Sequence, residues 1–291
     1  MVAIFGKPNV GKSTIINKIL QQKLCITSRK PQTTRHRILG IYTQDNYQIA
    51  FVDTPGLHKE NKVNMNKIMN KTATAATKDV EVIYFVVDSI NWNHLDDHAV
   101  NQLQKNRLDY TKCILVINKV DKIADKDSIL PLINELKNKY KFDDIVPISA
   151  RTGQNLDQLI QATKSYLYES DHCYPEDIIT DKPAKFVVSE LIREKIIHYT
   201  GDELPYATNV AIESFQITPK NTYIISALIN IERTSQKKMI IGSKGERIKT
   251  IGQAARKDIE ELLGNKVFLR LWVKVKNNWR DNILSLCDLG Q

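Results

Sequence analysis

The stretch Gly6-Lys7-Pro8-Asn9-Val10-Gly11-Lys12-Ser13 decides the fold of the first half of the chain. An apolar run at residues 2–5 precedes it and predicts a buried strand, and apolar residues at helical spacing follow it up to residue 22. A strand, a glycine-containing loop and a helix in this order form the context of a phosphate-binding loop. The two glycines let the backbone approach a ligand closely, and the helix N-terminus offers free N–H groups to an anion. We therefore predict that residues 6–13, together with Thr14, bind phosphate groups.

Length, composition and cysteine usage limit the class of protein. The chain has 291 residues, of which 42% are hydrophobic, enough for two domains with a core each. Its four cysteines are scattered without a C-x-x-C pair, which favours a reducing compartment over a disulfide framework or a metal site. No run is apolar enough to cross a bilayer and no signal peptide is visible, so a cytoplasmic protein is expected. Whether further residues precede Met1 is left open.

The net charge of +9 is concentrated near the C-terminus. Residues 233–280 contain 13 Lys and Arg and 4 Asp and Glu, so this stretch carries the net charge of the whole chain. Such an excess indicates a polyanionic partner. Nucleic acid is the favoured partner, and an anionic membrane surface is the lesser alternative.

Strand-like and helical runs alternate over the first 168 residues. The runs at 80–87 and 113–117 are almost continuously apolar, as parallel strands covered on both faces require. The other predicted strands are 2–5, 38–43, 47–52 and 145–148, and the predicted helices are 13–22, 62–78, 95–108, 129–140 and 156–167. This alternation predicts an α/β fold, a doubly wound and mostly parallel sheet of the P-loop kind.

Polar motifs follow three of these strands, at the sheet edge where such folds bind ligands. They are Asp53-Thr54-Pro55-Gly56-Leu57, Asn118-Lys119-Val120-Asp121 and Ser149-Ala150. With the phosphate loop, they resemble in order and spacing the loops GxxxxGK[ST], DxxG, NKxD and SA of TRAFAC-type GTPases. The resemblance implies that Asp121 accepts two hydrogen bonds from guanine, which adenine cannot donate, so GTP and GDP are the expected nucleotides. It also implies that Asn118 and Lys119 brace the loop and that the Ala150 N–H contacts the guanine oxygen.

The same resemblance implies roles around the terminal phosphate. Lys12 would reach the β- and γ-phosphates, and the Gly56 N–H would donate to a γ-oxygen. Ser13, Asp53 and a threonine of the switch loop would hold Mg²⁺. Thr33 and Thr34 both qualify, and alignment with the Pro-x-x-Thr-Arg form favours Thr34. We predict Lys12, Thr34 and Gly56 as the catalytic group.

One position departs from the Ras-like pattern. A glutamine usually follows DxxG and orients the attacking water, whereas here Leu57 has no polar group. We expect slow unassisted hydrolysis, with a partner or a bound K⁺ supplying the missing stabilisation. Asn9 is the residue that cation-assisted relatives use as a ligand.

The composition changes after residue 168. Residues 169–183 are acidic, contain proline and lack apolar periodicity, which predicts a linker between a domain at 1–168 and a second at 184–291. The second domain is predicted as a smaller α+β unit. Its helices are expected at 186–197, 246–263 and 278–286, and its strands at 209–217, 223–231 and 267–275.

A glycine turn, Gly242-Ser243-Lys244-Gly245, precedes the long helix of this second domain. Helix, two strands, G-x-x-G turn, helix and strand resemble a K homology (KH) domain, whose turn grips single-stranded RNA. With the turn, Arg247 and Lys249 are the predicted RNA-binding residues. Trp272 and Trp279 are predicted to serve the core instead of stacking on bases.

A GTPase domain followed by a KH domain resembles the Era family over essentially the whole chain. Pro31-Gln32-Thr33-Thr34-Arg35 and Ala254-Ala255-Arg256-Lys257-Asp258-Ile259 resemble that family closely. The resemblance implies a monomeric assembly factor for the 30S ribosomal subunit, which binds the 3′ end of small-subunit ribosomal RNA in its GTP-bound state. Two alternatives stay open: an RNA-binding module with a structural nucleotide, and a GTPase peripherally bound to the cytoplasmic face of the inner membrane.

Overall fold

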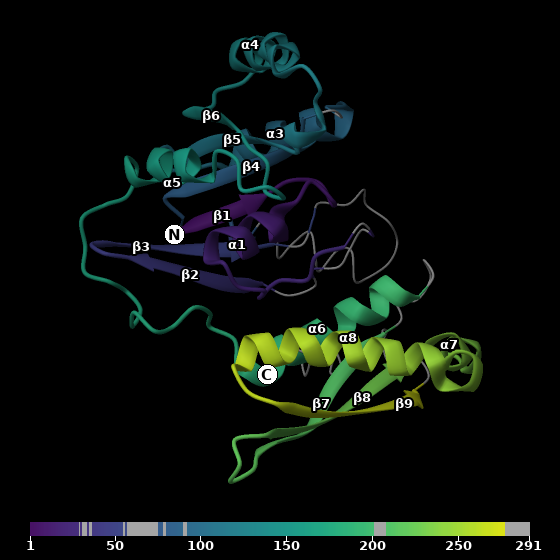
Figure 1. The fold of residues 1–291 in the computed structure, drawn as a ribbon. Helices are drawn as coiled ribbons and strands as arrows, with labels where there is room; N and C mark the ends of the chain where they lie inside the picture. Colours follow the sequence, from purple (N-terminus) through teal and green to yellow (C-terminus); the bar gives the residue numbers. More distant parts are fainter. Residues whose placement is uncertain are drawn as a thin grey trace. The chain divides into compact units, whose positions relative to one another are not determined.

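The computed structural model describes residues 1–28, 30, 34, 37–54, 56, 75–77, 80–89, 92–200 and 208–276, and the statements below concern these residues. The chain divides into two compact units (Figure 1). The first unit consists of Met1–Cys25 and Thr34–Asp181, and the second of Ile26–Thr33 and Lys182–Gln291. The helix predicted at 62–78 lies almost entirely outside the described residues, and the one at 278–286 entirely so.

A six-stranded sheet, in the order β2-β3-β1-β4-β5-β6, runs through the first unit. The β2–β3 pair is antiparallel and all other neighbours are parallel, which confirms the predicted mostly parallel sheet. The strands are β1 (Val2–Phe5), β2 (Ile38–Gln44), β3 (Tyr47–Asp53), β4 (Val82–Asp88), β5 (Lys112–Asn118) and β6 (Asp144–Pro147). The described helices are α1 (Lys12–Leu20), α3 (His94–Asn106), α4 (Leu130–Lys139) and α5 (Leu156–Lys164), with short 3-10 turns η1 (Val120–Lys122) and η2 (Lys126–Ile129).

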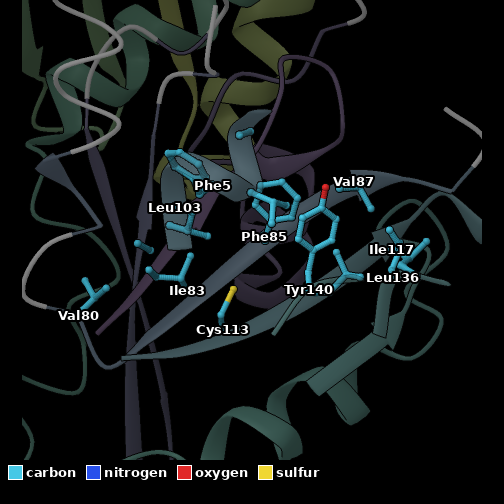
Figure 2. Close-up of a cluster of buried hydrophobic side chains, with 14 of the residues drawn as sticks. Phe5, Val80, Ile83, Phe85, Val87, Leu103, Cys113, Ile117, Leu136 and Tyr140 are labelled. Carbon is cyan, nitrogen blue, oxygen red and sulfur yellow. The ribbon is translucent and has the colours of Figure 1, made fainter. Parts of the chain in front are cut away.

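The central strands are buried on both faces. Successive side chains of β4, from Val82 to Val87, are at most 1% exposed. Because neighbouring residues of a strand point to opposite faces, this burial means that both faces of the sheet are covered. Figure 2 shows one of the two apolar layers, which β1, β4, β5, α3 and α4 build from residues such as Phe5, Phe85, Leu103, Cys113 and Leu136.

The parallel register brings the C-terminal ends of neighbouring strands to one edge of the sheet. Ile4 of β1 pairs with Asp53 of β3, and Asp88 of β4 pairs with Asn118 of β5. The loops that follow these strands therefore emerge side by side. This register places all four nucleotide motifs of the sequence at one edge.

The segment predicted as a linker is hydrogen-bonded to the outer strand of the first sheet. The Ile41 amide donates to Ile179 O at 2.8 Å, and the Leu39 amide donates to the Asp181 side chain at 3.1 Å. An outer strand presents unpaired backbone groups, and these contacts satisfy part of them. The end of the segment thus covers the β2 edge.

The second unit is a three-stranded sheet, in the order β7-β8-β9, with helices along one face (Figure 1). The β7–β8 pair is antiparallel and the β8–β9 pair is parallel. Its elements are α6 (Ala184–Tyr199), β7 (Asn209–Ile217), β8 (Tyr223–Ile231), α7 (Thr234–Ile241), η4 (Ser243–Gly245), α8 (Glu246–Leu263) and β9 (Val267–Val275). The three strands and α8 have the predicted bounds. Among the described helices of the chain, none is long and apolar enough to cross a membrane.

The prediction that Trp272 serves the core is wrong. Leu269, Leu271 and Val273 of β9 pack against the core of the second unit, whereas Trp272 is 60% exposed. The alternation of β9 correctly indicates one buried and one exposed face, and Trp272 lies on the exposed one. Size and hydrophobicity suggested burial, but the core positions were already filled by the odd-numbered residues. Trp279 lies outside the described residues.

Candidate functional sites

The loop between β1 and α1 passes so close to two other strands that two of its positions admit only glycine. A Cβ on Gly6 would lie 2.3 Å from Val86 O, and a Cβ on Gly11 would lie 2.2 Å from Asn118 Nδ2. Their φ angles are 150° and 103°. α1 begins at Lys12 directly after Gly11, so the free N–H groups of its first turn lie beside the loop. This arrangement suits an anion.

The predicted phosphate lysine is buried and bonded to the loop itself. Lys12 Nζ donates to Gly6 O at 3.1 Å and to Lys7 O at 2.7 Å, and the residue is 7% exposed. Burial lowers the pKa of Lys12 to about 8, and the nearby Asp53 carboxylate offsets part of this effect. A bound phosphate would favour the charged form. Lys12 is therefore held where anion binding and its own protonation are coupled.

Three oxygen-bearing side chains meet next to this lysine. Ser13 Oγ donates to Asp53 Oδ2 at 2.8 Å, and Thr34 Oγ1 lies 3.3 Å from the same oxygen and 3.1 Å from Ser13 Oγ. Asp53 is fully buried, and this burial raises its pKa, against the hydrogen bond from Ser13 and the charge of Lys12. Hydroxyl and carboxylate oxygens are the ligands that Mg²⁺ prefers, so the donor set fits that ion. The structure places Thr34 in this cluster, and Thr33 lies outside the described residues.

The turn after β3 contacts the phosphate loop. A Cβ on Gly56 would lie 2.8 Å from Pro8 N and 2.9 Å from Pro8 Cα, so this position also requires glycine. Thr54 anchors the turn, since its Oγ1 donates to Ile4 O at 2.6 Å. Pro55 and Leu57, both predicted nucleotide contacts, lie outside the described residues.

Asn118 connects three of the predicted nucleotide loops. Its Nδ2 donates to Val10 O at 2.8 Å, and its Oδ1 accepts from the Lys119 and Ala150 amides at 2.8 and 2.9 Å. Asn118 is 2% exposed, so these bonds are shielded from water. The bracing role predicted for Asn118 has this geometric basis. The Ala150 N–H donates to Asn118 here, and its contact with guanine stays a prediction.

The neighbouring side chains of the NKVD loop are also positioned. Asp121 Oδ1 accepts a hydrogen bond from Ser149 Oγ at 2.7 Å, which orients the carboxylate. Lys119 has a φ of 70°, and its Nζ donates to Asn9 O at 2.7 Å and to Asp88 Oδ2 at 2.6 Å. The NKVD, SA and phosphate loops therefore form one hydrogen-bonded assembly.

Sequence reasoning missed two acids of this assembly. Asp88 pairs with Lys119, and Asp96 of α3, 1% exposed, pairs with Lys7 at 2.5 Å. Asp88 ends a buried strand just as Asp53 does, and that signal could have identified it. Asp96 has the local signal of a capping box with Asn93, but its pairing with Lys7 depends on the packing of α3.

The glycine turn of the second unit has unusual backbone angles at three residues. φ is 73° at Gly242, 47° at Lys244 and 80° at Gly245. A Cβ on Gly242 would lie 2.7 Å from Arg247 Cβ. The turn ends at Glu246, where α8 begins, so the N-terminus of an 18-residue helix adjoins it.

A hollow of about 630 Å³ lies beside this turn. Of the six predicted RNA-binding residues, Gly242, Ser243 and Arg247 line it, whereas Lys244, Gly245 and Lys249 do not. The other lining residues come from α7 and were missed: Thr234, Lys237, Lys238 and Ile241. The basic pair Lys237-Lys238 was visible in the sequence, but the pattern of residues 234–241 did not give this helix bounds.

These two units define a class of protein, a P-loop GTPase joined to a KH domain. Residues 1–119 match the family described as 50S ribosome-binding GTPase, and residues 203–280 match the KH domain family. The order of the motifs and the fold of each unit agree with both matches.

The chain belongs to the GTPase Era family. GTPase Era of Pasteurella multocida (strain Pm70) is 50% identical over 289 residues, which cover 99% of this chain and 94% of the relative. GTPase Era of Haemophilus influenzae (strain PittGG) is 51% identical, with coverages of 99% and 95%. The family resemblance inferred from the motifs is confirmed.

Solved Era structures match the whole fold. The crystal structure of Era in complex with MgGDPNP and nucleotides 1506–1542 of 16S ribosomal RNA matches with a TM-score of 0.92 at 39% identity, covering 99% of this chain and 97% of that one. An Aquifex aeolicus Era variant bound to GDP·AlF₄⁻ matches with a TM-score of 0.93, with the same identity and coverages.

Proposed function

We propose that this protein is a GTP-hydrolysing switch that binds the 3′ end region of small-subunit ribosomal RNA and assists assembly of the 30S subunit. The observation that carries the proposal is the meeting of Ser13, Thr34 and Asp53 oxygens beside the buried Lys12. Membership in the GTPase Era family supports it. The Era structure with MgGDPNP and 16S ribosomal RNA supports both the nucleotide and the RNA.

The reaction that we propose is hydrolysis of GTP to GDP and phosphate. Water attacks the γ-phosphorus while the bond to the oxygen bridging the β- and γ-phosphates breaks. Lys12 compensates the charge of the β- and γ-oxygens, and the Gly56 N–H donates to a γ-oxygen. Ser13, Thr34 and Asp53 would hold Mg²⁺, which when bound neutralises charge that develops on the phosphates.

Guanine specificity is assigned to Asp121. Its carboxylate would accept from the ring N–H and the exocyclic amine of guanine, with Ser149 orienting it through the 2.7 Å hydrogen bond. Asn118 and Lys119 hold the loop against the phosphate loop. Adenine would leave the carboxylate without donors, which is costly in a site built for hydrogen bonds.

The test of this assignment exchanges the hydrogen-bonding partner of the base. Xanthine carries a carbonyl where guanine carries the amine, so Asp121→Asn should lose GTP affinity by roughly 100-fold or more and gain affinity for xanthosine triphosphate. Affinities are measured by nucleotide titration and turnover by phosphate release. The matched control is Asp125→Asn, the same substitution at an exposed acid four residues on. An unchanged preference for GTP in Asp121→Asn would refute the assignment.

We infer that GTP controls RNA binding through the segment between Cys25 and Thr34. Within the second unit, the Thr27 amide donates to Glu194 Oε2 of α6 at 3.2 Å, and Lys30 Nζ donates to Ile197 O at 2.8 Å. Thr34, at the end of the same segment, belongs to the oxygen cluster of the first unit. A ligand that holds Thr34 in one position would shift the conformational equilibrium of this segment, whose other part is anchored on α6. A contact that GTP makes with Thr34 and GDP does not would thereby act as a switch.

The domain assignment that we propose keeps residues 1–168 as the GTP-binding domain, 169–183 as the linker and 184–291 as the KH-type domain. The RNA-binding role is assigned to the hollow beside Gly242 and Arg247, to which Lys237 and Lys238 add positive charge. We propose a cytoplasmic monomer. Peripheral association with the membrane is the less favoured alternative, because the basic residues of this hollow adjoin a glycine turn suited to a nucleic-acid backbone.

A further inference from the structure

β9 and the residue on either side of it present a row of basic and aromatic side chains on the sheet face opposite the helices. We call it the β9 row: Lys266, Phe268, Arg270, Trp272, Lys274 and Lys276. All six residues are exposed, with Phe268 at 52% and Trp272 at 60%. α7 and α8 pack against the other face, and none of the described helices of the second unit covers this one. Two large rings thus stand in solvent where a folding argument alone would bury them.

The charge of the row is uncompensated among the described residues. Its four cations have no acidic partner there, and Arg270 lies over the Phe268 ring at 5.0 Å from the ring centroid. β8 and β9 contain no acid, and β7 contributes only Glu213, in a bulge. A surface of one sign beside apolar rings is complementary to a ligand that has both phosphates and flat apolar groups.

The neighbouring strand adds uncharged side chains beside the row. Ile224 pairs with Phe268 and Leu228 pairs with Trp272, so an aliphatic side chain flanks each ring. Four residues of strand separate the two rings, a distance of roughly 13 Å at about 3.3 Å per residue. Two bases of one extended strand can therefore stack on different rings, with Arg270 swinging off the Phe268 ring to meet the phosphate between them.

We propose that the β9 row is a second RNA-binding surface, which takes a single-stranded segment through base stacking on Phe268 and Trp272 and phosphate contacts with the cations. It is distinct from the hollow beside Gly242, which α7, η4 and α8 line. The inference rests on the proposed function only in taking RNA as the ligand. An RNA whose backbone is held at the glycine turn, if long enough, would reach the β9 row as a second site.

The experiment measures binding of the full chain to a fluorescent 20-nucleotide uridine RNA by anisotropy. Trp272→Leu, which keeps an apolar side chain but removes the ring, is expected to weaken binding at least about fivefold, and Trp272→Phe should retain most of it. Ile217→Ala, at a residue that is 54% exposed on β7, is the matched control and should bind like the parent. The double variant Arg270→Gln/Lys274→Gln should make the slope of log affinity against log salt shallower by about 1.4, because each of the two lost phosphate contacts contributes roughly 0.7 to that slope.

A separate variant distinguishes this proposal from the proposed function. Gly242→Asp with Lys244→Glu disables the glycine turn and should abolish binding of the 3′-terminal fragment of small-subunit ribosomal RNA while GTP hydrolysis without RNA persists. If this variant behaves so and Trp272→Leu binds the uridine RNA like the parent, only the β9 row fails. If the glycine-turn variant retains full RNA affinity, the proposed RNA site fails.

Two other occupants of the β9 row would overturn the proposal. Binding to phosphatidylglycerol vesicles that Trp272→Leu removes, with RNA binding intact, would assign the row to a membrane surface. A dimer in light scattering that Phe268→Ala with Trp272→Ala dissociates, again with RNA binding intact, would assign it to self-association of the β9 edge. Thermal melting of each variant confirms folding, which substitutions at such exposed positions should barely alter.

Discussion

Gly56→Ala tests whether the turn after β3 senses the γ-phosphate. The added Cβ would lie 2.8 Å from Pro8 N and 3.0 Å from Pro8 Cγ, so it falls roughly 0.7 Å short of an ordinary contact of about 3.5 Å. Pro8 cannot yield easily, because its ring fixes φ and because the same loop already runs so near β4 that a Cβ on Gly6 would lie 2.3 Å from Val86 O. We expect the turn, and with it the Gly56 amide, to be displaced by a similar distance.

A displacement of this size should affect hydrolysis far more than GDP binding. A misplacement near 1 Å, or the loss of one donor to a developing charge, costs about 100-fold in turnover. The Gly56 N–H contacts only a γ-oxygen, and GDP lacks the γ-phosphate. The dissociation constant for GDP should therefore stay within about threefold of that of the parent protein. Single-turnover phosphate release gives the first quantity and titration with a fluorescent GDP analogue gives the second.

The matched control places the same methyl group where it fits. A Cβ on Gly252 of α8 would lie 3.4 Å from Leu271 Cδ1, an ordinary contact, so Gly252→Ala should hydrolyse GTP like the parent. Hydrolysis by Gly56→Ala within about threefold of the parent would refute the steric reasoning, given the roughly 100-fold loss that it requires.

Two further predictions concern the phosphate loop. Burial lowers the pKa of Lys12 from 10.5 to about 8, so above pH 8 the unfolded chain binds more protons than the folded one, and the free energy of unfolding of nucleotide-free protein should rise by up to about 3 kcal/mol towards pH 10.5. Lys12→Met should lack this rise in urea unfolding from pH 7 to 10; parallel curves for both proteins would contradict the assigned pKa. Hydrolysis should be faster in potassium than in sodium buffer if Asn9 helps to hold K⁺, and Asn9→Ala should remove the difference. Equal rates of the parent in both buffers would exclude this role of the cation.

Local patterns in the sequence were sufficient for most of the described elements, with α7 as the exception, and for predicting the nucleotide site. Apolar alternation determines a strand almost residue by residue, as β7, β8 and β9 demonstrate. The four GTPase motifs are likewise local, because each is a loop that directly follows a strand. Their convergence follows from parallel pairing alone, since parallel strands end at the same edge.

Contacts between loops could not be read in this way. Nothing near Gly11 in the sequence indicates that a Cβ added there would clash with Asn118, 107 residues later. The pairing of Lys119 with Asp88 likewise depends on the β4–β5 register. The resemblance favoured Thr34 over Thr33, and the structure places Thr34 beside Ser13 and Asp53, whereas Thr33 lies outside the described residues, so the choice of switch threonine stays a prediction.

The sequence by itself determined most of the described strands and helices, though not α7, and it predicted which loops carry the nucleotide chemistry, because both depend on neighbours along the chain. Only the tertiary structure decided that Trp272 stays in solvent and that α7 lines the hollow beside the glycine turn. Both depend on which elements pack together: α7 and α8 pack on the face of β9 that carries Leu269, Leu271 and Val273, and this leaves the face of Trp272 exposed.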